Sequence, residues 1–364
     1  MSEIKQGYKQ TKVGIIPEDW EDIKIKDIVK VSQGLQIAID DRFTTPAHNR
    51  VFYITIPFIE GKKEEYIENP KSSTLCKKDD ILVVRTGSGV GKIIRGVEGA
   101  FHNNFFKVKP SDNINIDFFY YFLTSPRVQF LMAKYAGNSA IPDLNHGDFY
   151  SLDFLIPPLK EQEKIAEILT TWDKAITKQT ELLRAKELLK IALMQKLLSG
   201  EVRFDGFSDK WEEVKIKDIF EITRGYVLAV TEMSQEQTAE YKYPVYSSQT
   251  KNNGLTGYYK DYLFENCITW TTDGANAGDV NLRKGKFYCT NVCGVLKSDK
   301  GYANQCIAEI LNLVTKNYVS YVGNPKLMNN TMGGIKIKIP KSLPEQQKIA
   351  EVLSLADDEI NLLK

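Results

Sequence analysis

The chain has 364 residues, of which 42% are hydrophobic and 26% charged, and its net charge is +1. This composition is typical of globular proteins and excludes a wholly disordered, collagen-like or rod-shaped chain, while the length predicts two or three domains. Because the net charge is close to zero, a DNA-binding surface would have to concentrate Lys and Arg residues on one face or rely on the positive charge of a partner. No stretch is as long and apolar as a membrane helix, the N-terminus lacks a signal-peptide core, and five scattered cysteines fit a reducing compartment. We therefore expect a cytoplasmic protein without membrane contact.

Two segments of the chain return later in the sequence. Residues 20–34 (WEDIKIKDIVKVSQG) return 191 positions later as residues 211–225 (WEEVKIKDIFEITRG), with eight of fifteen identical. Residues 161–169 (EQEKIAEIL) return 184 positions later as EQQKIAEVL, with seven of nine identical. The bodies between them, about 125 and 120 residues long, show no simple resemblance. This pattern is expected if a repeated frame makes the same contacts twice while each body meets a different ligand, although drift after gene duplication would also produce it.

Each copy of the first segment is predicted to form a short strand that leads into a second strand. Ile23, Ile25 and Ile28 alternate with charged residues, and Gly34 closes the unit. The acid-x-Lys pattern at residues 22–24 and 213–215 also occurs in metal-dependent nucleases, but no Pro-Asp precedes it. We favour an exposed strand face.

A long helix is predicted for residues 161–199, which contain neither Pro nor Gly and lie between Pro158 and Gly200. Its apolar residues are spaced alternately four and three positions apart, as in a coiled-coil seam about 58 Å long. Residues 345–364 show the same spacing over about half that length. We expect the two helices to pack antiparallel, leaving the part of the seam at residues 179–197 bare or in contact with another subunit. The alternative is that the long helix folds onto its own domain.

The predicted helix interface is made of the apolar residues at these seam positions. They are Ile165, Leu169, Trp172, Ile176, Leu183, Leu193 and Leu197 in the first helix and Ile349, Leu353, Ala356, Ile360 and Leu363 in the second.

The residues that frame the two bodies resemble the specificity subunits of type I restriction-modification enzymes. The resemblance is carried by residues 7–20 (GYKQTKVGIIPEDW), by the helix start at 156–162 (IPPLKEQ) and by the second helix start at 343–350 (LPEQQKIA), and it extends over nearly the whole chain. It implies an α+β fold with two mixed α/β target recognition domains in a pseudo-two-fold relation, joined by long antiparallel coiled-coil helices. The expected domains are 1–160 and 201–344 for recognition, 161–200 for the spacer helix and 345–364 for a shortened second helix.

The resemblance also implies a function. Each recognition domain would read one half of a split, asymmetric site in double-stranded DNA, and the helices would act as a ruler and as a docking surface for methyltransferase subunits. Restriction/translocase subunits would join the complex for cleavage, and the shortened seam could support self-association. Half-sites on one face of B-DNA lie about 34 Å or a multiple apart, a spacing that a helix pair of up to ~58 Å could hold.

In the first body, residues 81–84 are predicted to form a buried strand that runs into a glycine-rich turn. Such a loop lets the backbone approach a DNA phosphate closely. A Walker A phosphate loop is excluded, because Thr86 and Ile93 stand where that motif requires Gly and Ser or Thr. A tight hairpin without a ligand is the alternative. The predicted DNA contacts are Arg85, Thr86, Gly87, Ser88, Gly89, Lys92, Asn103 and Asn104.

In the second body, residues 268–278 occupy the place that corresponds to this strand and loop. Amide and hydroxyl side chains suit base edges, since an amide can pair both atoms of the adenine major-groove edge. They also suit ordinary turns. The predicted DNA contacts are Ser247, Ser248, Gln249, Thr250, Thr272, Asp273, Asn276 and Asn291.

No catalytic or metal-binding motif is found in the sequence. Cys289 and Cys293 lack the spacing of a zinc finger, the three histidines lie outside any triad pattern, and the Asn-Pro-Pro-aromatic loop of amino-methyltransferases is absent. We expect neither catalysis nor a metal or cofactor. The alternatives are a two-domain protein-binding scaffold or regulator with a helical oligomerisation seam, and a metal-dependent nuclease.

Overall fold

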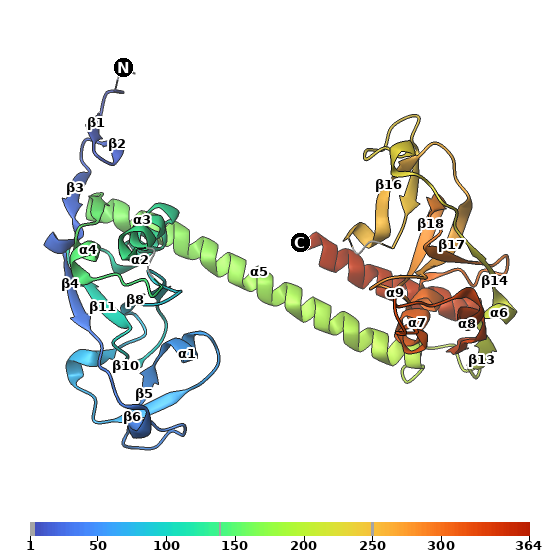
Figure 1. Cartoon of the computed structure of the whole chain (residues 1–364), viewed down its shortest axis with the longest axis horizontal. Helices are drawn as coiled ribbons and strands as arrows, with labels where there is room; N and C mark the ends of the chain where they lie inside the picture. The colour runs from blue at the N-terminus through green and yellow to red at the C-terminus, as the bar shows by residue number, and fades with distance from the viewer. Residues whose placement is uncertain (1–3, 138–139, 249–250) are drawn as a thin grey trace. The chain divides into compact units, whose positions relative to one another are not determined.

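The computed structural model describes residues 4–137, 140–248 and 251–364 (Figure 1). The chain divides into two compact units, Met1–Thr177 and Lys178–Lys364, called unit 1 and unit 2 below. Both units combine sheets with helices, and the helix α5 (Leu159–Ser199) begins in unit 1 and ends in unit 2. The expected α+β class with two mixed domains and long helices is confirmed. Within the described residues, no helix has the length and apolarity needed to cross a membrane.

Unit 1 contains two four-stranded sheets and two two-stranded sheets. Their orders are β6-β5-β10-β7, β4-β11-β8-β9, β12-β3 and β1-β2. The strands are β1 (Tyr8–Thr11), β2 (Gly14–Pro17), β3 (Glu21–Lys24), β4 (Val29–Gln33), β5 (Arg50–Ile54), β6 (Glu65–Glu68), β7 (Leu75–Cys76), β8 (Ile81–Val84), β9 (Ile93–Ile94), β10 (Gly99–Phe101), β11 (Phe105–Pro110) and β12 (Asp153–Ile156). The helices besides α5 are α1 (Ile56–Ile59), α2 (Ile116–Thr124), α3 (Pro126–Ala136) and α4 (His146–Tyr150).

Unit 2 is built on a six-stranded sheet in the order β14-β19-β17-β18-β15-β16, together with the pair β13-β20. Its strands are β13 (Glu212–Lys215), β14 (Glu221–Arg224), β15 (Tyr243–Tyr246), β16 (Leu255–Tyr259), β17 (Phe264–Thr271), β18 (Val280–Cys289), β19 (Cys293–Lys297) and β20 (Lys336–Ile339). Its helices besides the end of α5 are α6 (Ile216–Ile219), α7 (Gln305–Val314), α8 (Asn329–Gly334) and α9 (Leu343–Leu362).

The two repeated starts fold as expected, each as a strand leading into a second strand. In unit 1, β3 pairs antiparallel with β12, and β4 continues into the sheet against β11. In unit 2, β13 pairs antiparallel with β20, and β14 pairs with β19. A short helical turn separates the two strands, and it buries Ile25 in unit 1 and Ile216 in unit 2 completely.

The start of α5 is fixed to unit 1 by two neighbouring side chains. The buried Gln162 donates from Nε2 to the Pro157 carbonyl at 2.9 Å and accepts at Oε1 from the Asn115 backbone N–H at 2.9 Å. Asn115 in turn caps the N-terminus of α2 through two backbone N–H groups. Glu161 accepts a hydrogen bond from the Trp20 indole at 3.0 Å. These bonds tie the helix to both the repeated start and the helical part of the unit.

The start of α9 is fixed to unit 2 by a similar set of bonds. Gln346 donates to the Pro340 carbonyl at 2.8 Å and accepts from the side-chain amide of Asn304, which caps α7. Glu345 is only 1% exposed and accepts from the Trp211 indole, and Arg203 pairs with both of its oxygens at 2.8 Å. The repeated Trp and Glu-Gln residues are thus repeated because they make the same contacts twice.

In unit 2, the C-terminal half of α5 runs antiparallel to α9 (Figure 1). Gln179 donates to the Leu363 carbonyl at 2.9 Å, and Lys186 and Lys190 form ion pairs with Glu359 and Asp357 at 2.7 and 2.6 Å. The expected antiparallel pairing is confirmed. However, the expectation that residues 179–197 lie bare is wrong. In an antiparallel pair the start of α9 lies near the end of α5, so a 20-residue partner covers the second half of the long helix.

The predicted interface residues differ in burial along the seam. Leu197, Ile349, Leu353 and Ile360 are buried, and Ile165, Leu183, Leu193, Ala356 and Leu363 are half-buried. Leu169, Trp172 and Ile176, in the first half of α5, are 37%, 66% and 60% exposed. The exposed part of the seam therefore belongs to unit 1.

The glycine that closes each repeated start allows two backbones to approach closely. Gly34 and Gly225 donate their N–H groups to Phe105 and Cys293 at 3.3 and 3.0 Å. A Cβ on Gly34 would overlap the His102 carbonyl, and a Cβ on Gly225 would overlap the Cys289 carbonyl. Any side chain at either position must therefore push strands apart.

We predict that Gly225→Ala lowers the free energy of unfolding by roughly 1–3 kcal/mol, because the added methyl overlaps backbone that cannot turn away. Urea denaturation monitored by circular dichroism measures the effect. Gly334→Ala is the matched control, since a Cβ there meets nothing within 4 Å. Equal midpoints for the two variants would contradict the prediction.

Candidate nucleic-acid interface

Each unit carries the same glycine-rich loop at the end of a buried strand. In unit 1 the loop joins β8 to β9, and Gly91 N–H and Val84 N–H bond to the carbonyls of Val84 and Lys92 at 2.8 and 2.9 Å. In unit 2 the loop joins β17 to β18, and Gly278 and Thr271 make the corresponding bonds to Thr271 and Asp279 at 2.9 Å each. The correspondence predicted between residues 81–92 and 268–278 is thus present in the backbone.

The conformation of the two loops depends on glycines at matching positions. Gly87 and Gly91 have φ of 92° and 83°, and Gly274 and Gly278 have φ of 97° and 89°. Only glycine adopts this left-handed region without strain. The loops therefore keep one shape although their other residues differ.

Both loops are held from two sides by backbone hydrogen bonds. On one side, Gly87 N–H bonds to the Pro142 carbonyl at 3.0 Å and Gly274 N–H to the Pro325 carbonyl at 2.9 Å. On the other side, the loop joins the turn before the next strand of the sheet, through Arg85 N–H to Asn104 and Thr272 N–H to Val292. We call the glycine-rich loop, this turn and the segment at 142–145 or 325–328 the rim of each unit.

The rim of unit 1 gathers the residues predicted from the first body. The Arg85 guanidinium pairs with both oxygens of Asp143 at 2.9 and 3.2 Å. Asn103 donates to Gln36 at 3.1 Å, and its carbonyl accepts from the Gln33 side chain at 2.6 Å. Ser88 and Gly89 are exposed at the loop tip, and Lys92 is exposed where the loop returns to β9. The charge available to a ligand is therefore that of Lys92, because the charge of Arg85 is balanced by Asp143.

The rim of unit 2 gathers the residues predicted from the second body into one polar network. The Arg224 guanidinium reaches Thr272 at 2.8 Å, Asp273 at 2.7 Å and the Asn291 carbonyl. Asn276 donates to the Ser248 carbonyl at 3.1 Å. The Asn291 side chain is exposed, whereas Thr272 is buried. Thr272 therefore supports the rim and does not face solvent.

The Ser247 hydroxyl accepts a hydrogen bond from Thr290 at 2.9 Å, which joins the β15 end to the same turn. Gln249 and Thr250, two further predicted contacts, lie outside the described residues.

Sequence reasoning missed residues that the structure places on the rims. Gln33 and Arg224 stand at the same position of the repeated start, one before the closing glycine, and each donates from its side chain to the carbonyl of an asparagine in the turn. That position was visible in the repeat, and a polar side chain there in both copies was the available signal. Asp143 and Lys326, also at matching positions, carry opposite charges. No sequence pattern pointed to them.

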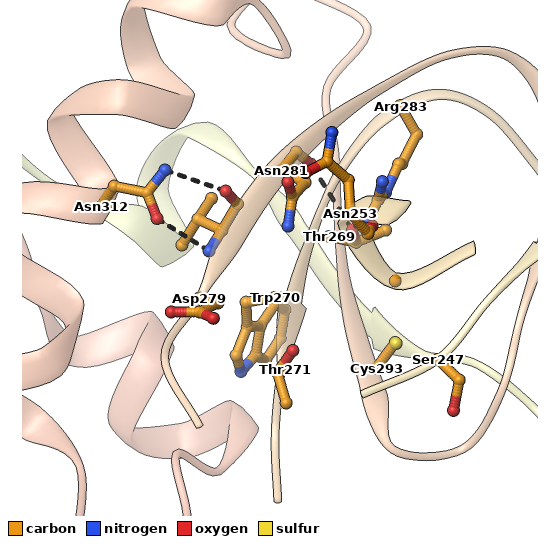
Figure 2. Close-up of a pocket in the computed structure, with 12 residues that line it drawn as sticks. Ser247, Asn253, Thr269, Trp270, Thr271, Asp279, Asn281, Arg283, Cys293 and Asn312 are labelled. Carbon is orange, nitrogen blue, oxygen red and sulfur yellow. Dashed lines mark hydrogen bonds between the residues drawn. The ribbon is translucent and has the colours of Figure 1, made fainter. Parts of the chain in front are cut away.

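A polar pocket of about 230 Å³ lies beside the rim of unit 2 (Figure 2). Asn253, Thr269 and Arg283 lie on one side of it, while Asn312, which bonds to both backbone groups of Val280, lies on the other. Arg283 is 7% exposed, donates to Thr269 at 3.0 Å and to the Asn253 carbonyl at 2.7 Å, and stacks 3.7 Å from the Tyr246 ring centroid. Burial lowers its pKa. Its buried charge is held by the Tyr246 ring, the Thr269 hydroxyl and the Asn253 carbonyl.

Within the described residues, no group of three or more His, Cys, Asp or Glu side chains is placed to hold a metal ion. All five cysteines are free and buried. Burial raises the pKa of Cys76 and Cys293 to about 11 and that of Cys306 to about 12, and it also raises the pKa values of Cys267 and Cys289. Burial lowers the pKa values of His102 and His146, which are therefore neutral at pH 7. None of these groups is poised as a nucleophile.

The family model of the type I restriction modification DNA specificity domain matches residues 17–185 and again residues 208–364, so the chain belongs to this family. A putative type I specificity subunit of Mycoplasma pneumoniae, S.MpnORF201P, is 34% identical over 206 residues, which are 56% of this chain and 81% of that protein. Another, the N-terminus of S.MpnORF289P, is 43% identical over 143 residues, which are 38% of this chain and 74% of that protein.

The fold is shared with a solved structure. The crystal structure of the type I restriction-modification S subunit from M. genitalium matches with a TM-score of 0.65 at 18% identity, covering 94% of this chain and 91% of that one.

We predict that the native chain does not react with a thiol reagent such as DTNB at pH 8 within minutes. Its thiols are buried and remain protonated there because their pKa values are raised. After unfolding in guanidinium, where a thiol has a pKa of about 8.5, all five cysteines should react. Rapid reaction of any thiol in the folded chain would contradict the burial described here.

Proposed function

We propose that this chain is the non-catalytic DNA specificity subunit of a cytoplasmic type I restriction-modification complex, in which each unit reads one half of a split, asymmetric DNA site. The observation that carries the proposal is the pair of rims. One loop scaffold, held by the same backbone hydrogen bonds, is built twice and carries different side chains each time. Because base readout depends on side chains while the approach to phosphate depends on backbone, such a pair would dock alike and read different sequences.

The polar groups of the two rims differ in the chemistry they offer to DNA. The rim of unit 1 presents Lys92 on its loop and the amides of Asn103 and Gln36, whereas the rim of unit 2 presents Lys326 on the 325–328 segment and the single amide of Asn291. The charge of Arg224 is balanced by Asp273, as that of Arg85 is by Asp143. Amides can pair with adenine and lysine with guanine in the major groove. The two half-sites should therefore differ, which makes the whole site asymmetric.

The helices would set the spacing and dock the catalytic partners. The 41 residues of α5 correspond to about 60 Å of continuous helix. Several large apolar residues on its second half remain outside the pairing with α9, and they are Leu182, Leu188, Leu189 and Ile191, at 44–58% exposure. An exposed apolar surface of this kind suits a protein partner. We propose that methyltransferase subunits bind there and that restriction/translocase subunits join the complex for cleavage.

We predict that Asn291→Ala, in the complex reconstituted with methyltransferase subunits, weakens binding to the cognate duplex by about 10–100-fold while leaving non-specific binding unchanged. The side chain is exposed, and Arg224 contacts only the backbone carbonyl of Asn291, so the rim itself should persist. Gel shifts on cognate and scrambled duplexes measure both affinities. Equal losses on the two duplexes would argue against base readout by this residue.

We further predict that Lys92→Ala weakens binding to all duplexes alike and lowers the slope of log K against log salt by about 1, as expected when one phosphate contact is lost. Lys109→Ala is the matched control, because Lys109 is also exposed but lies toward the far end of β11 from the rim. If the two variants give the same salt slope, Lys92 does not contact a phosphate.

A further inference from the structure

The polar pocket of unit 2 can be compared with unit 1 position by position. The matching hydrogen bonds of the two glycine-rich loops align Val84 with Thr271 and Lys92 with Asp279. The strand registers continue this alignment, because the facing residues of β8 and β9 match those of β17 and β18, and the facing residues of β8 and β11 match those of β17 and β19. The pocket residues on β17, on β19 and at the start of β18 therefore have known counterparts.

Four of these positions are apolar in unit 1 but line the pocket in unit 2. In unit 1 they are buried in one hydrophobic cluster, and they are Leu82, Val84, Ile94 and Phe105. In unit 2 they are, in the same order, Thr269, Thr271, Asn281 and Cys293. Unit 1 thus shows that apolar side chains can close the scaffold at this place. Unit 2 instead has a cavity of about 230 Å³ and lacks the stabilisation that filling it would provide.

A buried positive charge stands at one end of this pocket. Arg283 is 7% exposed, and the Thr269 hydroxyl and the Asn253 carbonyl accept hydrogen bonds from two of its five N–H groups. A charge is costly to bury unless an opposite charge accompanies it. Burial lowers the pKa of Arg283, and the side chains that oppose this shift are those of Tyr246 and two buried cysteines, none of them a carboxylate. Among the described residues, this end of the pocket therefore has no fixed negative charge to balance the guanidinium.

The acidic residue of the pocket lies at its other end. Figure 2 shows Asp279 away from the Arg283 guanidinium, around which Asn253 and Asn281 are gathered. Asp279 forms an ion pair with Lys316 at 2.8 Å, so its own charge is already balanced. The end of the pocket near Arg283 thus combines a cation with amide groups.

We propose that this pocket binds a small oxyanion, a phosphate or carboxylate group that is not part of a polynucleotide, at the Arg283 guanidinium and the Asn281 amide. Oxyanions accept strong hydrogen bonds from guanidinium groups, and the amide adds a further donor. The bound ion would balance the buried charge and occupy space that apolar side chains fill in unit 1. The phosphates of a duplex are fixed to a wide rod and cannot reach a guanidinium that is almost wholly covered, whereas a free ion can.

The test measures the binding of inorganic phosphate and of acetate to the full chain by isothermal titration calorimetry, in Tris chloride at constant ionic strength. The chain should bind one equivalent of at least one of these ions to saturation. Asn281→Ile should weaken the binding about tenfold or more, because it removes a donor and places in the pocket the side chain that Ile94 supplies in unit 1. Arg283→Met should abolish the binding, since the charge is lost.

Lys284→Met is the matched control, because Lys284 follows Arg283 on β18, is exposed and does not line the pocket. It removes the same charge and should leave the affinity unchanged, and circular dichroism should show that Asn281→Ile and Lys284→Met are folded. If neither ion binds to saturation, the pocket holds only water and the proposal is wrong. Binding that folded Asn281→Ile leaves intact would also overturn it, as would displacement of the ion by an equimolar random duplex, which would indicate a DNA phosphate contact. The ion titrations contain no DNA, so their outcome is independent of the function proposed above.

Discussion

The rest of the structure depends on how a helix is attached at its first turn. In both units a buried glutamine hydrogen-bonds to a proline carbonyl and to the asparagine that caps a neighbouring helix. The preceding glutamate accepts a hydrogen bond from a tryptophan indole. Buried polar groups are costly unless each is satisfied, so these bonds allow one direction of the helix relative to its unit. The helix α5 passes without interruption from unit 1 into unit 2. The bonds of Glu161 and Gln162 therefore attach to unit 1 a helix that also forms part of unit 2.

The two units show how one scaffold can support two surfaces. The rims are held by bonds between backbone groups and by glycines with positive φ, so their shape does not require particular side chains at the tips. Arg85 with Asp143 and Arg224 with Asp273 stabilise the rims by different pairs that join different segments. The partial exposure of these ion pairs makes their contribution to stability small, so the backbone bonds carry most of the architecture.

The sequence predicted the parts of the fold that depend on identical side chains. The repeated starts could be predicted because the Trp, Glu and Gln contacts require those residues in both copies. The paired helices followed from their repeated apolar spacing, and the antiparallel direction followed from a two-fold relation between the halves. The strand at residues 81–84 and the glycine-rich turn were predictable from hydrophobicity and composition. By contrast, beyond the matching strand and loop at residues 81–92 and 268–278, the likeness of the two bodies was hidden, since backbone hydrogen bonds leave no trace in side-chain identity.

Which half of the seam stays exposed was predicted wrongly for a related reason. The apolar stepping is the same along all of α5, and only the partner's register decides which stretch is covered. The roles of Gln33 and Arg224 were missed because a polar residue before a glycine is common in turns. The DNA contacts themselves remain predictions, although the structure brings most of the chosen residues to two rims.

Because backbone hydrogen bonds support the rims, the side chains at the rim tips can change readily during evolution. Ser88 and Asn291 are exposed, so replacing them should leave the folded state nearly as stable as before. Substitutions in a packed core usually destabilise a protein, whereas surface substitutions usually have small effects. New preferences for DNA sequence could therefore arise by single substitutions in either unit, while the fold is conserved.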